Sequence, residues 1–209
     1  MTQAVIFDVG RVLIEWDVFA LYRKLLPNDD EITAFIMEVG LLEHNLEFDR
    51  GLAYAEGIPR LANKFPHRAE LIYAYDERWE ETVTGAIEGS VDILSELSSS
   101  GVPLYAITNF AREKWDLTSR RFPFLTESFR DIAVSGHEGV VKPEPEIYRR
   151  LLQRNDLAPE GCVFIDDSEK NVEGARRIGI DAILFESPQG LRRNLIARGL
   201  PLEDPDTSP

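Results

Sequence analysis

Short apolar runs that alternate with helix-like segments constrain the fold of this 209-residue chain more than any other feature. Short apolar runs separated by segments of helical periodicity are typical of strands buried in a parallel sheet. The runs are residues 4–7, 102–107, 132–134, 162–165 and 182–185. The alternation predicts an α/β fold with a doubly wound, Rossmann-like core built on a parallel sheet.

Two of the connecting segments carry start and stop signals for helices. Residues 90–97 have an amphipathic pattern, with Ser90 as the expected N-cap and Gly101 just beyond the end. Ser168 likewise opens a helical stretch that ends at Gly179. These helices complete the alternation on which the fold prediction rests.

Residues 16–84 break the alternation, because their pattern is helical and no strand-like run interrupts it. We interpret this stretch as a helical cap domain seated over the strand ends, with residues 1–15 and 85–200 as the core domain. The alternative is a set of extra helices packed on a face of the sheet. Residues 201–209 are polar and contain proline, which predicts a flexible tail.

Composition restricts the classes of partner. The 44% hydrophobic and 29% charged residues are ordinary for a soluble globular protein, and no segment approaches the roughly 20 apolar residues that span a bilayer. The N-terminus lacks a secretory signal, so we expect a cytoplasmic protein. The net charge of -14 argues against nucleic acid as a partner but allows a small phosphorylated substrate. The single cysteine, Cys162, lies in an apolar run and is expected to be buried.

Polar residues follow four of the predicted strands. Asp8, Thr108, Lys142 and the pair Asp166 and Asp167 should converge, because the carboxyl ends of parallel strands share one edge. Thr108 and Asn109 precede a helix that begins near Ala111, so they either bind an anion there or cap the helix. Pro143 holds the backbone of Lys142 extended. Lys142 therefore either acts in the cleft or is a residue of a surface loop.

The three carboxylates among these residues need compensation. Two like charges about 4 Å apart repel by roughly 4 kcal/mol at an effective dielectric near 20. If Asp8, Asp166 and Asp167 lie together, they must therefore take up protons or hold a cation. A hard cation such as Mg²⁺ prefers oxygen ligands. The other interpretation of the acidic pair is that one member caps the following helix.

These residues form a recognisable series in the chain, consisting of Phe7-Asp8-Val9-Gly10, Ile107-Thr108-Asn109, Lys142-Pro143 and the stretch Phe164 to Ser168. In this order they resemble the four motifs of the haloacid dehalogenase superfamily of hydrolases. The resemblance covers nearly the whole chain, and the helical insertion is similar to the C1 cap of that superfamily.

The resemblance implies a phosphatase. Asp8 would attack phosphorus and form an aspartyl-phosphate that water hydrolyses. Thr108, Asn109 and Lys142 would bind the phosphoryl group. A Mg²⁺ cofactor would be held by Asp8, the carbonyl of Gly10 and Asp167, with Asp166 acting through a water. The cap would close over a small phosphorylated metabolite such as a sugar phosphate.

Gly10 departs from the usual phosphatase pattern, in which this position is a second aspartate that acts as general acid and base. Such assistance is typically worth about 10²–10⁴-fold in rate. Glu15 and Asp17 are candidates to replace it, and a substrate with a good leaving group would need it less. Some relatives with helical caps share this Asp-x-Gly form.

Two alternatives to the phosphatase stay open. One is a metal-independent 2-haloacid dehalogenase, in which Asp8 attacks carbon, although the acidic pair counts against it. The other is a non-catalytic binding protein on the same fold. The sequence leaves the physiological substrate and the oligomeric state open. Residues of the cap that are candidates to read the substrate are Trp16, Phe19, His44 and Phe48.

Overall fold

The computed structural model describes residues 4–203, so most of the predicted tail, residues 204–209, lies outside the described residues. Its centre is a five-stranded sheet in the order β5-β4-β1-β6-β7, and every pairing in it is parallel. The strands are β1 (Ala4–Phe7), β4 (Leu104–Thr108), β5 (Asp131–Val134), β6 (Cys162–Asp166) and β7 (Asp181–Leu184). The predicted doubly wound α/β fold is confirmed.

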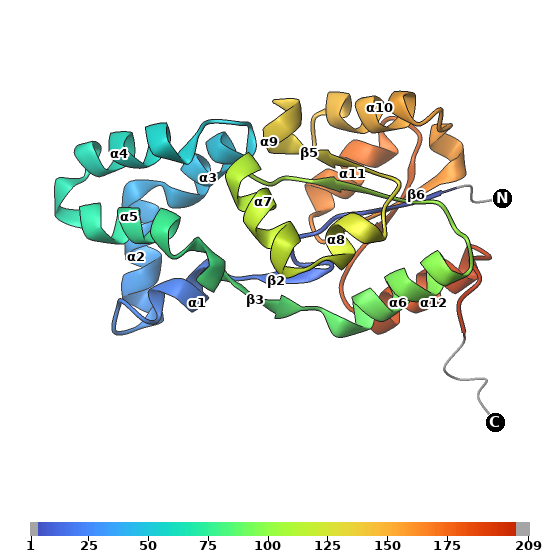
Figure 1. Cartoon of the computed structure of the whole chain (residues 1–209), viewed down its shortest axis with the longest axis horizontal. Coiled ribbons are helices and arrows are strands. Elements are labelled where there is room, and N and C mark those ends of the chain that lie inside the picture. The colour runs from blue at the N-terminus through green and yellow to red at the C-terminus, as the bar shows by residue number, and fades with distance from the viewer. Residues whose placement is uncertain (1–3, 204–209) are drawn as a thin grey trace.

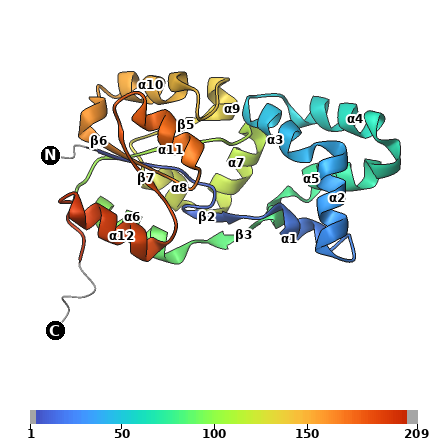
Figure 2. The ribbon, with the colours of Figure 1, turned by 180° about the vertical axis from the view of Figure 1, so that it is seen from behind.

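Helices cover both faces of this sheet (Figures 1 and 2). One face carries α6 (Glu88–Ser99) and α12 (Pro188–Ala197), and the other carries α10 (Pro145–Arg154) and α11 (Glu169–Arg176). Side chains of β1 alternate between the two resulting cores, with Val5 and Phe7 in one and Ala4 and Ile6 in the other. A strand buried on both faces is apolar at every position, which explains the uninterrupted apolar runs of the sequence.

The inserted helices lie beside the sheet in both views (Figures 1 and 2). They are α1 (Val18–Tyr22), α2 (Asp29–Val39), α3 (Leu41–Asp49), α4 (Tyr54–Lys64) and α5 (Ala69–Glu77). The short antiparallel strands β2 (Ile14–Trp16) and β3 (Val83–Ala86) join them to the rest of the chain. The sequence pattern does not predict this pair, because two partly exposed segments of three and four residues far apart in the chain carry no hairpin signal. That these helices form a separate cap domain remains our proposal.

The remaining helical elements are short or connect the strands, and their bounds are α7 (Arg112–Arg121), α8 (Phe124–Glu127), α9 (Ser135–Glu138), η1 (Pro66–Arg68), η2 (Trp79–Thr82) and η3 (Pro159–Gly161). Among residues 4–203, no helix combines the length and the apolar character needed to cross a bilayer. Cys162 is buried, as predicted.

The predicted helix ends are mostly correct. Ser168 is the N-cap residue of α11, and Gly101 and Gly179 adopt positive φ angles of 76° and 91° where the chain leaves α6 and α11. The prediction that Ser90 caps α6 is wrong, because the helix starts at Glu88 and buries Ser90 inside it. The N–H of Ile87 donates to the carbonyl of Leu13. This backbone hydrogen bond to a distant part of the chain sets the start of α6 before Ser90.

Candidate active site

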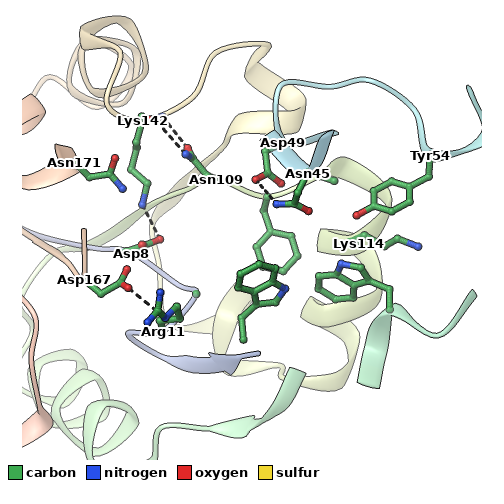
Figure 3. Close-up of a pocket in the computed structure, with 15 residues that line it drawn as sticks. Asp8, Arg11, Asn45, Asp49, Tyr54, Asn109, Lys114, Lys142, Asp167 and Asn171 are labelled. Carbon is green, nitrogen blue, oxygen red and sulfur yellow. Dashed lines mark hydrogen bonds and ion pairs between the residues drawn. The ribbon is translucent and has the colours of Figure 1, made fainter. Parts of the chain in front are cut away.

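Asp8 and Lys142 form the centre of the site (Figure 3). The N–H of Asp8 donates to the carbonyl of Ile165 at 2.8 Å, which places the side chain just beyond the carboxyl end of β1. The Lys142 ammonium lies 2.7 Å from Asp8 Oδ1, and the N–H of Val9 donates to the same oxygen at 2.6 Å. Among residues 4–203, Asp8 Oδ2 accepts no hydrogen bond. One oxygen of Asp8 is therefore held while the other remains available.

Asp166 is the second anchor of Lys142. Its Oδ2 lies 2.7 Å from the ammonium, and both of its oxygens accept hydrogen bonds from the amide of Asn171. The backbone N–H of Ser168 also donates to Oδ1. Asp166 is completely buried, and its oxygens are occupied by these contacts. This arrangement suits a residue that positions Lys142 more than one that binds a metal directly.

Asp167 completes a group of three carboxylates. One oxygen each of Asp8, Asp166 and Asp167 lie within 4.8 Å of one another. Arg11, which has a positive φ of 60°, approaches Asp167 with its Nε at 3.4 Å (Figure 3). Gly10 lies on the wall of the same pocket. Of the predicted metal ligands, Asp8, Gly10 and Asp167 therefore line the pocket together, whereas Asp166 is buried beside them and does not line it.

The electrostatics of this group favour an added cation. Burial raises the pKa of Asp8 to about 8; the ammonium of Lys142 opposes this shift, and the charges of Asp166 and Asp167 reinforce it. Burial and the charge of Asp166 also raise the pKa of Asp167. Burial would lower the pKa of Lys142, but Asp166 and Asp8 outweigh it and keep that pKa raised. The Lys142 ammonium and the guanidinium of Arg11 offset only part of the charge of three carboxylates, so a divalent cation with oxygen ligands fits this site.

Asn109 and Thr108 differ in their relation to the pocket. The side chain of Asn109 forms two hydrogen bonds with the backbone of Lys142. Its Oδ1 accepts from the Lys142 N–H at 2.7 Å, and its Nδ2 donates to the Lys142 carbonyl at 3.0 Å. It also lines the pocket. Thr108 is buried at the end of β4 and is not part of the pocket wall. Within the described part of the chain its hydroxyl has no hydrogen-bond partner.

Residues from the inserted helices and their connections form the opposite wall of the pocket. The wall residues from this part of the chain are Trp16, Asn45, Asp49, Tyr54 and Trp79, and Phe110 and Lys114 from the core adjoin them. Trp16 is thus the one member of the four predicted substrate-reading residues that lines the pocket. Phe48 is instead fully buried and stacks on Tyr54, with ring centroids 4.1 Å apart.

The two acids considered as replacements for the missing aspartate lie elsewhere. Neither Glu15 nor Asp17 belongs to the pocket wall. Asp17 caps α1 by accepting from the N–H of Phe19 at 2.9 Å, and it also pairs with Arg23.

The pocket wall also contains residues that the sequence did not predict, among them Asn171, Arg11 and Asp49. Asn171 lies five residues after Asp166, on the first turn of the helix that Ser168 opens, so a helical projection would have found it. Arg11 directly follows Gly10. Asp49 carried no signal, because its position depends on how α3 packs against the core.

Comparison with known proteins is consistent with this geometry. Residues 43–185 match the haloacid dehalogenase-like hydrolase family. The phosphorylated carbohydrates phosphatase of Thermotoga maritima is 26% identical over 87% of this chain and 83% of its own length. The chain spans 20%, 36% and 64% of the length of three other curated relatives.

Among the solved structures that share the fold are two enzymes of different activity. A haloacid dehalogenase family enzyme from Bacteroides thetaiotaomicron, in complex with magnesium and inorganic phosphate, has a TM-score of 0.72 and 23% identity, and covers 90% of this chain and 96% of its own. The L-2-haloacid dehalogenase of Xanthobacter autotrophicus has a TM-score of 0.62 and 21% identity, and covers 96% of this chain and 85% of its own. The family match extends over more than half of the sequence, and this chain belongs to the haloacid dehalogenase-like hydrolases.

Proposed function

We propose that this protein is a Mg²⁺-dependent phosphatase that hydrolyses a small phosphorylated metabolite through an aspartyl-phosphate on Asp8. The observation that carries the proposal is the group of three carboxylate oxygens within 4.8 Å of one another, with the Lys142 ammonium 2.7 Å from two of these residues. A nucleophilic carboxylate that must approach an anionic phosphoryl group requires this type of charge compensation.

Each residue then has a defined role. Asp8 attacks phosphorus with the oxygen that Lys142 and Val9 leave available. Lys142 neutralises charge on Asp8 and on the phosphoryl group, and Asn109 fixes the backbone of Lys142. Bound Mg²⁺, held by Asp8, Gly10 and Asp167, would supply positive charge to the phosphoryl oxygens. Thr108 would donate to a phosphoryl oxygen, which requires its buried hydroxyl to become accessible when the substrate binds.

The pocket wall supports a substrate whose leaving group has an apolar face. Trp16, Tyr54, Trp79 and Phe110 provide that surface, and Asn45 provides polar contacts beside it. A sugar phosphate suits this combination, because the apolar faces of sugar rings stack on aromatic side chains while their hydroxyls form hydrogen bonds. We also propose that residues 16–84 act as a lid that excludes water from the reaction.

A phosphate-release assay tests the proposal. The purified protein is incubated with a panel of phosphorylated metabolites and with 4-nitrophenyl phosphate, with Mg²⁺ or with a chelator. We expect turnover that needs Mg²⁺, and we expect Asp8→Asn to abolish it while the circular dichroism spectrum stays unchanged. Turnover that persists in Asp8→Asn would remove Asp8 as the nucleophile.

The same panel separates the alternatives. Gly10 is compatible with the metal-independent dehalogenase, since that reaction requires no acid for the leaving group, and chloride release from 2-chloropropionate in chelator would establish it. A protein without turnover in either assay, but stabilised against heat by a member of the panel, would be a binding protein.

A further inference from the structure

The proposed reaction requires a proton donor that Gly10 cannot supply. An alkoxide leaving group must be protonated as it departs, and the water that later attacks the aspartyl-phosphate must lose a proton. No atom outside the immediate chain neighbours lies within 4 Å of the position that a Cβ on Gly10 would occupy. The space is open, and the described structure places no neighbouring side chain in it.

One further carboxylate faces the pocket from the opposite side. The acids of the pocket wall are Asp8, Asp167 and Asp49. The first two belong to the nucleophile and metal group, whereas Asp49 projects from the end of α3 (Figure 3). It is 8% exposed, so the polar groups around it determine its chemistry.

The contacts of Asp49 suit a residue that holds and releases a proton. Asn45 Nδ2 donates to Asp49 Oδ2 at 3.0 Å. The hydroxyl of Tyr75 donates to Asn45 Oδ1 at 2.6 Å, which fixes the orientation of the amide with its N–H group toward Asp49. The neighbouring Ala111 also presents a backbone N–H. Asn45 and Ala111 both donate hydrogen bonds to Asp49, so neither of them accepts a hydrogen bond from its protonated form. The acceptor for a proton on Asp49 is therefore in the pocket, where the substrate oxygen would lie.

Asp49 can change protonation state near neutral pH. Burial raises its pKa to about 7, while the Ala111 N–H and the Lys142 ammonium oppose the shift. A carboxyl group with a pKa near the working pH can serve both as acid and as base.

The other ionisable groups on or beside this wall do not compete for that role. Burial raises the pKa values of Tyr54 and Tyr75 well above neutrality. The ammonium of Lys114 is paired with Asp76 and lies over the ring of Tyr54.

We infer that Asp49 is the general acid and general base of this enzyme, an inference that rests on the proposed phosphatase function. In the first step an oxygen of Asp8 bonds to phosphorus, the bond from phosphorus to the ester oxygen breaks, and that oxygen takes the proton of Asp49. In the second step the Asp49 carboxylate takes a proton from water as the water oxygen bonds to phosphorus. The bond from phosphorus to Asp8 breaks, which restores both carboxyl groups and releases inorganic phosphate.

Asp49→Asn tests this inference with two substrates. Glycerol phosphate, whose leaving group needs a proton, should lose about 100- to 10,000-fold in kcat/KM. With 4-nitrophenyl phosphate, whose leaving group does not, the variant should release a rapid burst of nitrophenolate equal to the enzyme present. Slow turnover should follow, because the second step lacks its base. Asp17→Asn, the same change outside the pocket, is the matched control and should retain wild-type rates with both.

Further outcomes separate the two proposals. Gly10→Asp should restore activity to Asp49→Asn, because it places a carboxyl group in the open space beside Asp8. Wild-type rates in Asp49→Asn with both substrates would overturn the inference and leave the phosphatase intact. A wild-type protein without phosphatase activity would overturn both. If Asp49→Asn fails to fold, the pH dependence of the wild-type enzyme tests the inference. The kcat/KM for glycerol phosphate should fall above about pH 7, whereas the kcat/KM for 4-nitrophenyl phosphate should not fall there. Parallel pH profiles for the two substrates would overturn the inference.

Discussion

Lys142 is buried between two carboxylates, and its charge holds them in place. Its ammonium lies 2.7 Å from both Asp8 and Asp166 in a part of the core where each of the three groups is almost entirely buried. Removing one partner from such a cluster leaves uncompensated charge in a region of low dielectric, a change that typically costs 3–5 kcal/mol.

Lys142→Met should therefore lower the free energy of unfolding by about 3–5 kcal/mol and abolish activity. Urea unfolding followed by circular dichroism measures the first effect. The control is Lys170→Met, which removes an exposed lysine on α11. A Lys142 variant as stable as the control would show that the buried carboxylates are already protonated and do not need the ammonium.

The raised pKa of Asp8 gives a prediction for the pH dependence of activity. Asp8 must be ionised to attack, so the rate should rise with pH through its pKa, which is about 8 without metal. Bound Mg²⁺ favours the ionised form and should move this rise to lower pH. Initial rates against pH at limiting and saturating Mg²⁺ measure the shift. If the rate rises at the same pH at both Mg²⁺ concentrations, Asp8 is not in contact with the metal.

The strand-end residues of the site could be predicted from the sequence, whereas the residues of the opposite wall could not. Asp8, Asp166 and Asp167 lie at the ends of buried strands, and strand topology brings such positions to one edge. The prediction that Lys142 also ends a strand is wrong, because it lies in the turn between α9 and α10, where Asn109 holds its backbone. Asp49 reaches the pocket through the packing of α3, which no local pattern encodes. The roles assigned to the strand-end residues remain predictions.

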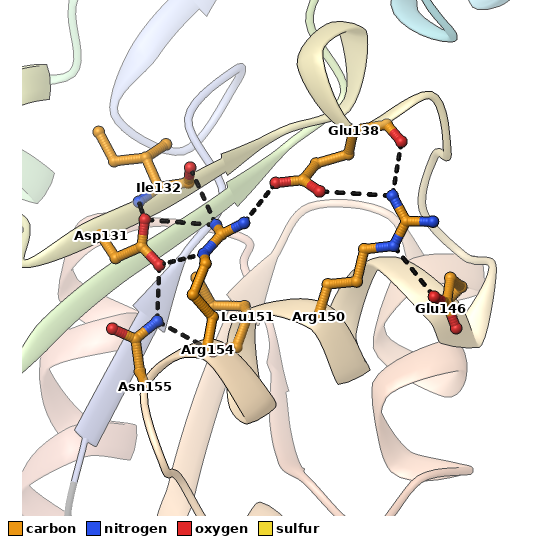
Figure 4. Close-up of polar contacts among 8 residues, drawn as sticks. All are labelled: Asp131, Ile132, Glu138, Glu146, Arg150, Leu151, Arg154 and Asn155. Atoms are coloured by element: carbon orange, nitrogen blue, oxygen red, sulfur yellow. Dashed lines mark hydrogen bonds and ion pairs between the residues drawn. The ribbon is translucent and has the colours of Figure 1, made fainter.

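Among the elements, α10 is tied to the edge strand β5 and to α9 by a network of charges (Figure 4). Arg154 donates to Asp131 at 2.7 Å and to Glu138 at 2.6 Å. Asn155 adds a bond to Asp131 at 2.6 Å, and Arg150 donates to the carbonyl of Glu138. The network fixes the helix that follows Lys142 at its far end, away from the pocket.

Arg154→Met should lower the free energy of unfolding by about 0.5–1 kcal/mol, since the Arg154 side chain is 41% exposed and solvent screens its pairs. Burial raises the pKa of Asp131, but Arg154 and Asn155 outweigh it and hold that pKa below the usual value. The stabilisation is therefore present above the unfolded pKa near 3.9 and is lost as the pH falls through the lower folded value.

Urea unfolding at pH 7 and at pH 2.5 tests this prediction, with Arg149→Met on the exposed side of the same helix as the control. The difference in the free energy of unfolding between the two variants should be smaller at pH 2.5 than at pH 7. An equal difference at both values would assign the effect to lost packing of the arginine stem.

The sequence predicted the core elements closely because burial determines them. Each strand of the five-stranded sheet lies within two residues of its predicted run, since a strand covered on both faces must be apolar throughout. The pair β2 and β3 was missed because its residues are partly exposed and its pairing is long-range. The start of α6 was misplaced because a backbone bond from Ile87 to Leu13, not a side-chain cap, sets it.

At the scale of the whole molecule, the pocket lies between the carboxyl edge of the sheet and the inserted helices, so ligand binding should stabilise the complete fold. A ligand that binds the folded state at 100 times its Kd adds about 2.7 kcal/mol to the free energy of unfolding. Mg²⁺ should therefore raise the melting temperature of the wild-type protein.

Asp167→Asn should remove most of this shift, because Asp167 supplies one of the three carboxylates of the proposed metal site. Asp30→Asn, which changes an exposed acid on α2, should keep it. Thermal melts with and without MgCl₂ provide the measurement. Equal shifts in both variants would indicate that Mg²⁺ acts by screening the net charge of -14 and not at the site.

The most direct test of the account is to trap the phosphorylated enzyme. The wild-type protein is mixed with 4-nitrophenyl phosphate and Mg²⁺, quenched in acid within the first turnover, digested and analysed by mass spectrometry. We predict one phosphoryl group on the peptide that contains Asp8, and none when Mg²⁺ is replaced by a chelator. Full phosphate release with that peptide unmodified, or with the phosphoryl group on another residue, would contradict the account.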